Sequence, residues 1–479
     1  MARLLTFAPR DPWHQACDAS LQREMVLVLP DLVMDGQHAA AVEMLSEMLR
    51  NDSQFTAPVL DSLGSLQLNP EMLKQVSEMV TDSVASANVA DLPVVIRFLL
   101  QHMTKDTAKD VVDALRSGLG VEALNPDGDT AEAGQPGGET LVLDAVQSAL
   151  RLRRELTSLV LEQLEKVKHA ADHRAVDWWL ICALHTTSVA RDKTKVHKLV
   201  QTKAAKAQIT RELLQAAIVG HSGALRPHYQ THLELAGKLL GASDATARRL
   251  GRSLYVLLLR EFDGKHGQDR QELIGCLLTH VGSGNEAEVD AALQTLVQLA
   301  SEHTAALSKF SAFLTGILDF LDSLTVTQAR LVYELFARLA CDAPDASRLP
   351  DELAIIIRKQ LSNPSLKYKR LGMLGGCSLM ARLGARRAAA ETVLEAGQAG
   401  TSADGDGTKP LPMERARLDQ AKEHLDLMLK YATAADGSKS FMLRELSRMV
   451  ASRSSPVSNE ITDLLAESVT TNFETDYLV

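Results

Sequence analysis

Apolar residues recur every three or four positions along most of the chain. One uninterrupted run of this kind comprises Val142, Val146, Ala149, Leu152, Leu156, Val160, Leu164 and Val167. Because residues three or four apart lie on the same face of an α-helix, this run predicts one long amphipathic helix. Hardly any stretch alternates between apolar and polar residues with a period of two, so the pattern does not favour strands.

The same spacing predicts further helices that are separated by short turns. They are expected at 25–34, 38–49, 70–84, 91–103, 108–119, 209–218, 230–240, 244–262, 271–281, 287–300, 313–324 and 327–339. Breaks such as Asp35-Gly36 and Asn69-Pro70 are short and consist of turn-forming residues, as antiparallel helix pairs require. No crisp repeat signature is present, which leaves degenerate repeats. The predicted fold is all-α, an irregular α-solenoid of HEAT/armadillo-like antiparallel helix pairs.

Two segments rich in Gly, Pro and acidic residues interrupt the helical pattern. Neither contains enough apolar residues to offset the entropy of ordering, so both are predicted to be flexible loops. Each is interpreted as an insertion between repeats, with a docking or regulatory loop as the less favoured alternative. The expected organisation is a helical solenoid segment at 1–124, a loop at 125–140, a helical segment carrying basic stripes at 141–390, a loop at 391–413 and a helical segment at 414–479.

Length and composition agree with an elongated helical protein. A chain of 479 residues exceeds what one compact core supports, so it forms several domains or one array of stacked units. Hydrophobic residues make up 46% and charged residues 23%, which is typical of a folded protein. Aromatic residues are only 4% while Leu and Ala dominate, a balance that favours helices over sheets.

Cysteine usage and the amino-terminal sequence indicate a soluble intracellular protein. Cys17, Cys182, Cys276, Cys341 and Cys377 are odd in number, lie far apart and form no CxxC pair. Neither a disulfide framework nor a thiolate zinc site is therefore expected, and the thiols are interpreted as small apolar groups in a reducing compartment. No apolar run reaches the roughly 20 residues that span a bilayer, and the first 16 residues lack the apolar core of a signal peptide.

Motifs that carry catalytic chemistry are absent from the sequence. There is no phosphate-binding GxxxxGK[ST], no GxGxxG, no HExxH and no nucleophile elbow. His228 and His232 would share a helical face near Glu234, but no further ligands are evident, so no metal site is predicted. Trp178-Trp179 lies in an apolar run and is interpreted as core packing. We expect no catalytic residue and no cofactor.

Basic residues cluster at two places in a chain whose net charge is −10. The first cluster, six cations in sixteen residues, consists of Arg191, Lys193, Lys195, Lys198, Lys203 and Lys206. Such density suits binding to phosphates, but a solvated helical edge is an equally good interpretation. The second cluster flanks a turn at Asn363-Pro364 and consists of Arg358, Lys359, Lys367, Lys369 and Arg370. All eleven are candidate DNA contacts.

Several sequence blocks in one order resemble the Fanconi anaemia group D2 family. They are VLDSL (59–63), DLPVVI (91–96), GNEAEVD (284–290), GILDFLD (316–322) and IRKQLS (357–362). The resemblance runs from about Gln22 to the tail at 472–476 and is thin through both predicted loops. Family members are longer at both ends, so the chain is expected to be a central fragment or a truncated gene model.

The resemblance implies a nuclear α-solenoid that acts in DNA repair without being an enzyme. Family members pair with the Fanconi anaemia group I protein and clamp double-stranded DNA during interstrand crosslink repair, and the family is also tied to homologous chromosome pairing at meiosis. Their switch is the attachment of one ubiquitin to a helical lysine by a dedicated ligase and conjugating enzyme. No membrane and no small-molecule substrate is implied.

At the acceptor position implied by the resemblance, this chain has an arginine. The family places its lysine three residues after a Ser-Ala-Ile-Arg stretch, which corresponds to 148–151 here and puts Arg154 at that position. A guanidinium offers no free amine to attack a thioester. In a continuous helix Lys168 returns to within about 40° of the Arg154 direction, whereas Lys166 lies about 120° away. Either the mark is absent, or the register differs, or another lysine serves, for which Lys168 is preferred.

Two functions therefore remain open at the level of the sequence. The first is a DNA-clamping repair scaffold, which predicts salt-sensitive DNA binding and a solenoid partner. The alternative is a generic HEAT-like protein–protein adaptor in which the basic clusters are plain surface. The affinity for duplex DNA distinguishes the two.

Overall fold

The computed structural model describes residues 18–66, 68–120, 124, 137–262, 267–342, 349–385, 412–452 and 457–477. These residues form α-helices and short 3₁₀ helices; they contain no strand, and one isolated β-bridge joins Ala385 to Val457. The predicted all-α class is confirmed. The chain divides into two compact units, Met1–Leu273 and Ile274–Val479. No described helix combines the length and the apolarity needed to cross a membrane.

The first unit consists of helices that are joined mostly by short turns. Its elements are α2 (Ala19–Leu32), η1 (Asp35–Gln37), α3 (His38–Asn51), η2 (Ser53–Phe55), α4 (Thr56–Ser65), α5 (Pro70–Ser83), η3 (Val84–Ser86), α6 (Leu92–His102), α7 (Ala108–Gly118), α8 (Gly138–Leu152), α9 (Glu155–Lys166), η6 (Ala170–Asp172), α10 (Ala175–Thr187), α11 (Ala190–Ala205), α12 (Arg211–Ile218), α13 (Ser222–Leu225), η7 (Arg226–His228), α14 (Tyr229–Leu240) and α15 (Ala245–Glu261). Helix α16 (Gln268–Val281) contains the boundary between the units.

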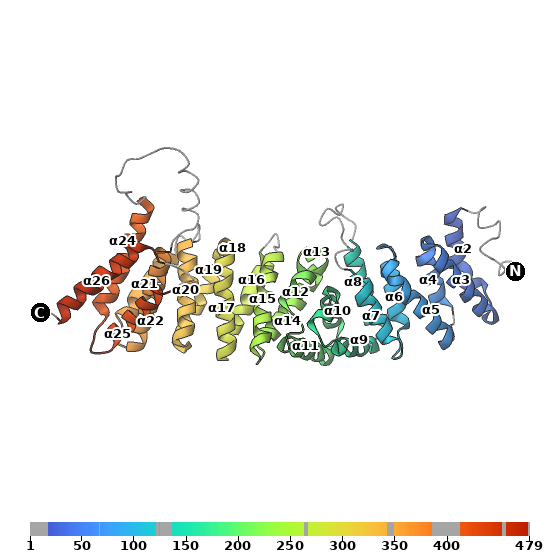
Figure 1. Ribbon diagram of the computed structural model, residues 1–479, viewed down its shortest axis with the longest axis horizontal. Helices are drawn as coiled ribbons and strands as arrows, with labels where there is room; N and C mark the ends of the chain where they lie inside the picture. Colours follow the sequence, from blue (N-terminus) through green and yellow to red (C-terminus); the bar gives the residue numbers. More distant parts are fainter. Residues whose placement is uncertain are drawn as a thin grey trace, which may run out of the picture. The chain divides into compact units, whose positions relative to one another are not determined.

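Packing within the first unit follows the order of the chain. Helix α4 packs on α2 and α6, α8 on α6 and α10, and α14 on α11 and α15. Successive helices lie side by side in this order (Figure 1). Most of the strongest contacts join helices that are near neighbours in the sequence, although α8 also packs on α13. Such an arrangement is a stack of helix pairs, as a solenoid requires.

Polar side chains cap the first turns of several helices. The side chain of Asn69 accepts a hydrogen bond from the Met72 amide at 2.8 Å, and Pro70 begins α5. Asp244 caps α15 in the same way, through the amides of Thr246 at 2.7 Å and Ala247 at 3.0 Å. Such caps replace the hydrogen bonds that the first amides of a helix lack.

Helix α10 forms the core of the region that carries the first basic cluster. Trp178 and Trp179 are buried, and the Trp179 indole donates a hydrogen bond to the carbonyl of Ala217 at 2.8 Å. The interpretation of this pair as core packing is confirmed. Every described residue from Val176 to His185 is buried, so α10 is surrounded by protein along most of its length.

The prediction of one long helix over 142–167 is wrong, because two helices, α8 and α9, occupy this segment. Arg153 has an extended backbone, with φ −124° and ψ 98°. Its guanidinium donates hydrogen bonds to the carbonyls of Gln101 at 2.5 Å and Met103 at 3.1 Å, at the carboxyl end of α6. This contact between segments far apart in the sequence accompanies the break, and apolar periodicity does not reveal it.

The second unit is a further stack of helices. Its elements are α17 (Glu286–Glu302), α18 (Thr304–Ser308), α19 (Ser311–Leu314), η8 (Thr315–Ser323), α20 (Val326–Asp342), α21 (Leu349–Leu361), α22 (Leu366–Leu383), α24 (Pro412–Tyr431), α25 (Ser438–Val450) and α26 (Asn459–Tyr477). The helix expected at 313–324 is mostly the 3₁₀ helix η8.

Helix α22 is the centre of the second unit. It packs on α20, α21, α24 and α25. Glycines allow this close packing, because a Cβ added at Gly372 would lie 2.9 Å from the amide nitrogen of Leu361 and one at Gly376 would lie 2.6 Å from the sulfur of Met428. A residue with a side chain does not fit at these positions without moving its neighbours.

Both predicted loops fall largely outside the described residues. Of the segment 125–140, residues 125–136 lie outside them, and α8 already begins at Gly138. Of the segment 391–413, residues 391–411 lie outside them, and α24 begins at Pro412. The division between the two units falls within the helical segment expected at 141–390.

Candidate nucleic-acid interface

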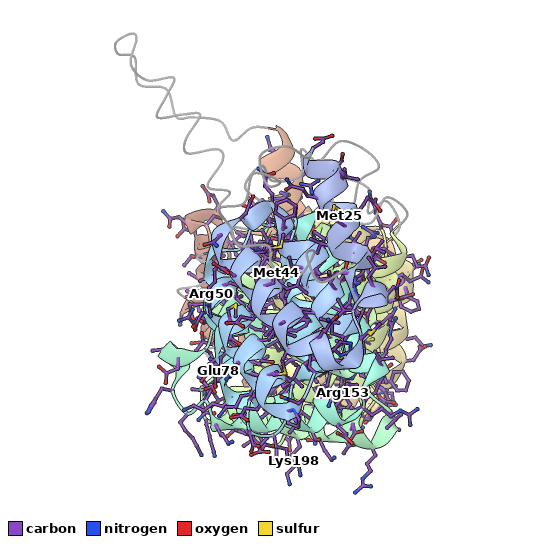
Figure 2. The ribbon with its side chains drawn as sticks, turned by 90° about the vertical axis from the view of Figure 1, so that its right-hand side faces the viewer. Met25, Met44, Arg50, Glu78, Arg153 and Lys198 are labelled. Carbon is purple, nitrogen blue, oxygen red and sulfur yellow. The ribbon has the colours of Figure 1, made fainter. Side chains whose placement is uncertain are left out.

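Four of the six cations in the first basic cluster share the solvent-exposed face of α11. Arg191, Lys195, Lys198 and Lys206 are exposed. At about 100° per residue these four positions fall within an arc of about 80°. Figure 2 shows the side chain of Lys198 pointing away from the helices. The face is therefore a ridge of positive charge with a spacing that follows the helical period.

Most of this exposed face is available to a ligand. Lys195 pairs with Asp192 at 2.9 Å, three residues earlier on the same helix. Arg191, Lys198 and Lys206 have no ion-pair partner among the residues that the structure describes. Because cations that already hold a carboxylate must give it up to bind a phosphate, the unpaired ones bind at the smallest cost.

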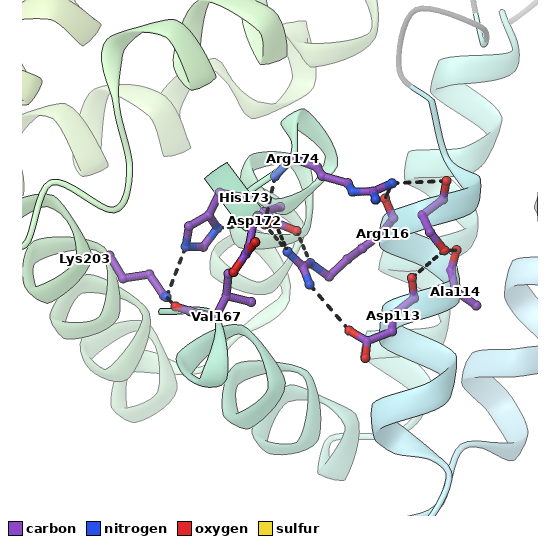
Figure 3. Close-up of polar contacts among 10 residues, drawn as sticks. Asp113, Ala114, Arg116, Val167, Asp172, His173, Arg174 and Lys203 are labelled. Carbon is purple, nitrogen blue, oxygen red and sulfur yellow. Dashed lines mark hydrogen bonds and ion pairs between the residues drawn. The ribbon is translucent and has the colours of Figure 1, made fainter. Parts of the chain in front are cut away.

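Lys203 does not belong to the exposed face, so its prediction as a DNA contact is wrong. Lys203 is 2% exposed and lies on the buried side of α11. The Lys203 ammonium donates to the carbonyl of Val167 at 2.6 Å and lies 3.2 Å from Nε2 of His173 (Figure 3). Lys203 continues the apolar stripe of Val196, Leu199 and Val200, which explains why it points inward.

A chain of buried polar groups extends from Lys203 to α7. His173 Nδ1 lies 2.7 Å from Oδ2 of Asp177, and Arg116 Nε donates to Oδ1 of Asp177 at 2.7 Å. If His173 accepts from Lys203 at Nε2, its Nδ1 carries the proton that Asp177 accepts. Arg174 and Asp172 border the same network (Figure 3). The network connects α7, α10 and α11 through hydrogen-bonded charges.

Burial and charge shift the pKa values of this network. Burial alone raises the pKa of Asp177, but hydrogen bonds from His173 and Arg116, with the Arg116 charge, bring it below its ordinary value. Burial lowers the pKa of Lys203 to about 8, and the Arg116 charge acts in the same direction. The network therefore favours an ionised Asp177 and makes the charge of Lys203 costly.

A surface hollow next to this network is acidic. It has a volume of about 830 Å³ and is bordered by α5, α7 and residues 171–174. Its charged lining consists of Glu78, Asp82, Asp110, Asp113, Arg116, Asp172 and Arg174. Carboxylates outnumber cations in it, so it does not suit a phosphate ligand.

The second basic cluster is arranged differently from the first. Arg358 and Lys359 are exposed at the end of α21. On α22, Lys367 donates to the carbonyl of Asp322 at 2.6 Å, and Lys369 pairs with Asp436 at 2.7 Å. The Arg370 guanidinium lies 5.5 Å from the ring centroid of Phe441. The three cations on α22 therefore bind groups of the same unit.

The pair of histidines singled out in the sequence is part of the core. His228 Nε2 lies 2.7 Å from the Gln147 amide nitrogen, and His228 Nδ1 lies 3.0 Å from the Thr186 hydroxyl. His232 Nδ1 lies 2.8 Å from the backbone carbonyl of His228. Both rings are buried and have protein partners, so they do not form a ligand pair with Glu234.

Glu234 instead lies next to two histidines that the sequence reasoning missed. His185 Nε2 and His197 Nε2 are 2.9 Å apart. Glu234 Oε2 is 3.5 Å from His185 Nε2, and Oε1 is 3.3 Å from His197 Nε2. Lys193, half-buried at the edge of α11, lies 3.9 Å from the same carboxylate. The group comes from α10, α11 and α14, and no spacing within one helix signals it.

Burial keeps both imidazoles of this group neutral near pH 7. It lowers the pKa of His185 to about 4, and the Lys193 charge acts in the same direction while the Glu234 charge opposes it. The pKa of His197 is also lowered, chiefly by burial. A neutral imidazole has one free nitrogen lone pair, which can accept a hydrogen bond or bind a metal ion.

Arg154 lies at an exposed position at the start of α9, whereas Lys168 lies beyond its end. Helix α9 ends at Lys166, and Val167 is extended with φ −70° and ψ 111°. The continuous helix on which the directions of Lys166 and Lys168 were compared is therefore absent. Both lysines are exposed, and Lys166 pairs with Glu162 at 3.0 Å.

Comparison with known proteins gives a consistent set of relatives. A sequence model described as "Fanconi anaemia protein FancD2 nuclease" matches residues 15–479. The Fanconi anemia group D2 protein homolog of Mus musculus is 30% identical over 399 residues, which cover 79% of this chain and 27% of that protein. The Fanconi anemia group D2 protein of Gallus gallus is 24% identical over 479 residues, which cover 96% and 32%. The chain thus spans less than a third of the length of these relatives.

Solved structures with a similar arrangement of helices are distant. A homology model of the full-length AP-3 complex is 10% identical, with a TM-score of 0.30, and the match covers 91% of this chain and 79% of that chain. The karyopherin Kap121p bound to the extreme C-terminus of Cdc14p is 9% identical, with a TM-score of 0.32, and the match covers 99% and 54%. Neither likeness bears on function.

Proposed function

Because the chain belongs to the FancD2 family, we propose that it is a non-enzymatic scaffold of DNA repair in the nucleus. In this proposal it pairs with the Fanconi anaemia group I protein and clamps double-stranded DNA during interstrand crosslink repair. Its own contribution to the clamp is the exposed face of α11, formed by Arg191, Lys195, Lys198 and Lys206.

The observation that carries the proposal is the availability of these cations in a chain of net charge −10. Three of the four have no ion-pair partner among the described residues, and all four point to solvent. A row of unpaired cations attracts a polyanion and releases its counterions on binding. Acidic surface elsewhere, such as the hollow bordered by α5 and α7, repels the same polyanion.

The experiment is duplex-DNA binding by the purified chain as a function of salt concentration, with and without the group I protein. The test variant changes Arg191, Lys195 and Lys198 to Glu. Each lost phosphate contact lowers the slope of log affinity against log salt by about 0.9, so the three together lower it by up to about 3. Lys193 is left unchanged because it pairs with Glu234.

The matched control changes three exposed lysines outside both basic clusters, Lys74, Lys105 and Lys109, to Glu. Its net charge equals that of the test variant, so a difference between the two cannot come from net charge. The proposal requires that the test variant loses affinity and slope while the control keeps most of both. Equal, weak binding by wild type and both variants, with the group I protein present, would instead indicate a helical adaptor without a DNA role.

The non-enzymatic part of the proposal is tested separately, because the description of the family model contains the word nuclease. Nucleases that use two metal ions hold them with carboxylates. Within the described ranges, the group that could hold a metal ion contains two imidazoles and one carboxylate, which does not match that chemistry. Labelled duplex incubated with the chain and Mg²⁺, Mn²⁺ or Zn²⁺ should remain intact, and cleavage above a no-protein control would contradict the scaffold proposal.

The ubiquitin switch is proposed to use another lysine, since Arg154 cannot accept the modification. Lys168 is chosen over Lys166 because Lys166 pairs with Glu162, whereas Lys168 has no ion-pair partner among the described residues. Lys168 is exposed and follows the end of α9, where a conjugating enzyme can reach it. Reconstituted ubiquitination with the family's ligase, followed by peptide mass spectrometry, should place the modification on Lys168, and Lys168→Arg should abolish it. Lys166→Arg is the matched control, and modification that persists in Lys168→Arg would rule this site out.

A further inference from the structure

We infer that His185, His197 and Glu234 form a binding site for one divalent transition-metal ion, Zn²⁺, that joins α10, α11 and α14. Among the residues that the structure describes, this is the group of three potential ligands whose nitrogen and oxygen atoms all lie within 4.8 Å of one another. The inference does not depend on DNA binding, on the group I protein or on ubiquitin.

The spacing of the ligand atoms suits a tetrahedral ion. Ligands bound at about 2.0–2.1 Å in tetrahedral geometry lie about 3.3 Å from one another. The two contacts of Glu234 with the imidazoles are 3.3 Å and 3.5 Å, which is close to this value. The two imidazole nitrogens are 2.9 Å apart and need to separate by only about 0.4 Å.

The chemistry of the ligands favours Zn²⁺ over Mg²⁺ or Ca²⁺. Two imidazole nitrogens and one carboxylate are a set that binds transition metals, whereas Mg²⁺ and Ca²⁺ prefer sites made of oxygen atoms. The Glu234 side chain is 42% exposed while those of His185 and His197 are 1% and 14% exposed. Solvent therefore reaches the site from the Glu234 side, where water can supply the fourth ligand.

The surroundings of the site oppose the ion at two points, the charge of Lys193 and the buried Nδ1 of His185, whose proton has no acceptor when Nε2 binds the metal. Lys193 lies 3.9 Å from Glu234, so its charge repels a bound cation and competes for the carboxylate. His185 Nδ1 is buried without a hydrogen-bond partner, so Nε2 is the atom through which this ring makes its polar contacts. Lys193→Gln should therefore tighten metal binding, whereas the loss of a ligand should weaken it.

The test uses the whole chain after dialysis against a chelator, titrated with ZnCl₂ or CoCl₂. We expect one Zn²⁺ per chain by elemental analysis and a rise in the midpoint of thermal unfolding of roughly 2 to 4 °C at saturating Zn²⁺. Bound Co²⁺ should give the visible absorption of a tetrahedral site without a thiolate charge-transfer band. That band would assign the metal to a cysteine, Cys182, Cys276, Cys341 or Cys377, and would overturn the inference.

The decisive variant is Glu234→Gln, which keeps the size of an exposed side chain and removes its charge. Its affinity for Zn²⁺ should fall by about 100-fold, and the thermal shift should disappear. Glu288→Gln is the matched control. The Glu288 carboxylate lies 2.5 Å from Nδ1 of His280, but these two residues do not belong to a group of three potential ligands among the described residues. Zn²⁺ binding that is absent in the wild type, or equal in wild type and Glu234→Gln, would overturn the inference.

Discussion

The cations on α11 and those on α22 have similar composition but different arrangements, whereas Arg358 and Lys359 of the second cluster are exposed at the end of α21, as most of the α11 cations are. On α11, Arg191, Lys198 and Lys206 are exposed and, within the described chain, have no ion-pair partner. On α22, Lys367 donates to the backbone carbonyl of Asp322, Lys369 pairs with Asp436, and the Arg370 guanidinium lies over the ring of Phe441. Both helices pack on four others. The difference is that the exposed cations of α11 point to solvent, whereas those of α22 lie next to Asp322, Asp436 and Phe441. Charge density in a sequence therefore does not measure the charge that a ligand can reach.

The largest effect is expected when the buried hydrogen-bond network beside α11 is disrupted. Asp177→Ala leaves Arg116 and His173 without their shared carboxylate, and the side chains of Asp177 and His173 are both 1% exposed. We expect the free energy of unfolding of the first unit to fall by about 3–5 kcal/mol. Urea unfolding followed by tryptophan fluorescence measures this change, because Trp178 and Trp179 are in the adjacent core of α10.

The control for that prediction is Asp192→Ala, which removes the carboxylate that pairs with Lys195 on the exposed side of α11. A solvent-exposed pair contributes less than about 1 kcal/mol, so the stability should change little. Equal losses in the two variants would mean that the buried network does not hold α11 in place.

The second prediction concerns the close packing that encloses α22. A Cβ at Gly375 would lie 2.6 Å from the side chain of Ile357 and 2.9 Å from that of Tyr333. Gly375→Ala should therefore lower the free energy of unfolding of the second unit by about 1–3 kcal/mol. Gly275→Ala, at a helical glycine with no atom within 4 Å of the added Cβ, should be neutral or stabilising by up to about 1 kcal/mol. Circular dichroism in urea compares the two, and a larger loss in Gly275→Ala would contradict the packing explanation.

The smallest expected effect is the pH dependence of the stability that the ion pair of Lys369 with Asp436 contributes. The Lys369 ammonium donates a hydrogen bond to the Asp436 carboxylate, and the hydroxyl and amide of Ser438 donate further ones. Together they hold the pKa of Asp436 well below its ordinary value. A carboxylate with a lowered pKa stabilises the folded state above its unfolded pKa of about 3.9, and this contribution is lost as the pH falls through the folded value. The pair is partly exposed, so we expect less than about 1 kcal/mol at pH 7.

The measurement is the difference in unfolding free energy between wild type and Lys369→Met at pH 7, 5 and 3. It should be present at pH 7 and 5 and shrink at pH 3, because Asp436 is then largely protonated in the unfolded chain while it stays ionised in the folded chain. A difference that grows as the pH falls would show that Lys369 stabilises the unit by another contact.

Local patterns predicted the helices but not the contacts between them. Periodicity placed α3 at 38–49 and α5 at 70–84, close to the observed His38–Asn51 and Pro70–Ser83. It missed the break at Arg153, because the carbonyls that bind this arginine belong to α6. It also predicted one helix where η8 forms a 3₁₀ turn.

The candidate interface and its surroundings also contain a part that the sequence could predict and a part that it could not. The exposed positions of α11 follow from the helical period, and the same period could have assigned Lys203 to the apolar stripe of Val196 and Leu199. The group of His185, His197 and Glu234 was not predictable, since its members come from three helices that only the tertiary packing brings together. The residues bound by α22 cations were likewise not predictable.

The most direct test of the account neutralises three cations on α11 or three on α22 and compares the salt dependence of duplex-DNA binding. One variant changes Arg191, Lys195 and Lys198 to Gln, and the other changes Lys367, Lys369 and Arg370 to Gln, so that both lose the same charge. The account predicts that the α11 variant lowers the slope of log affinity against log salt by up to about 3, and the α22 variant by less than about 1. A loss in the α22 variant that equals or exceeds the loss in the α11 variant would contradict it.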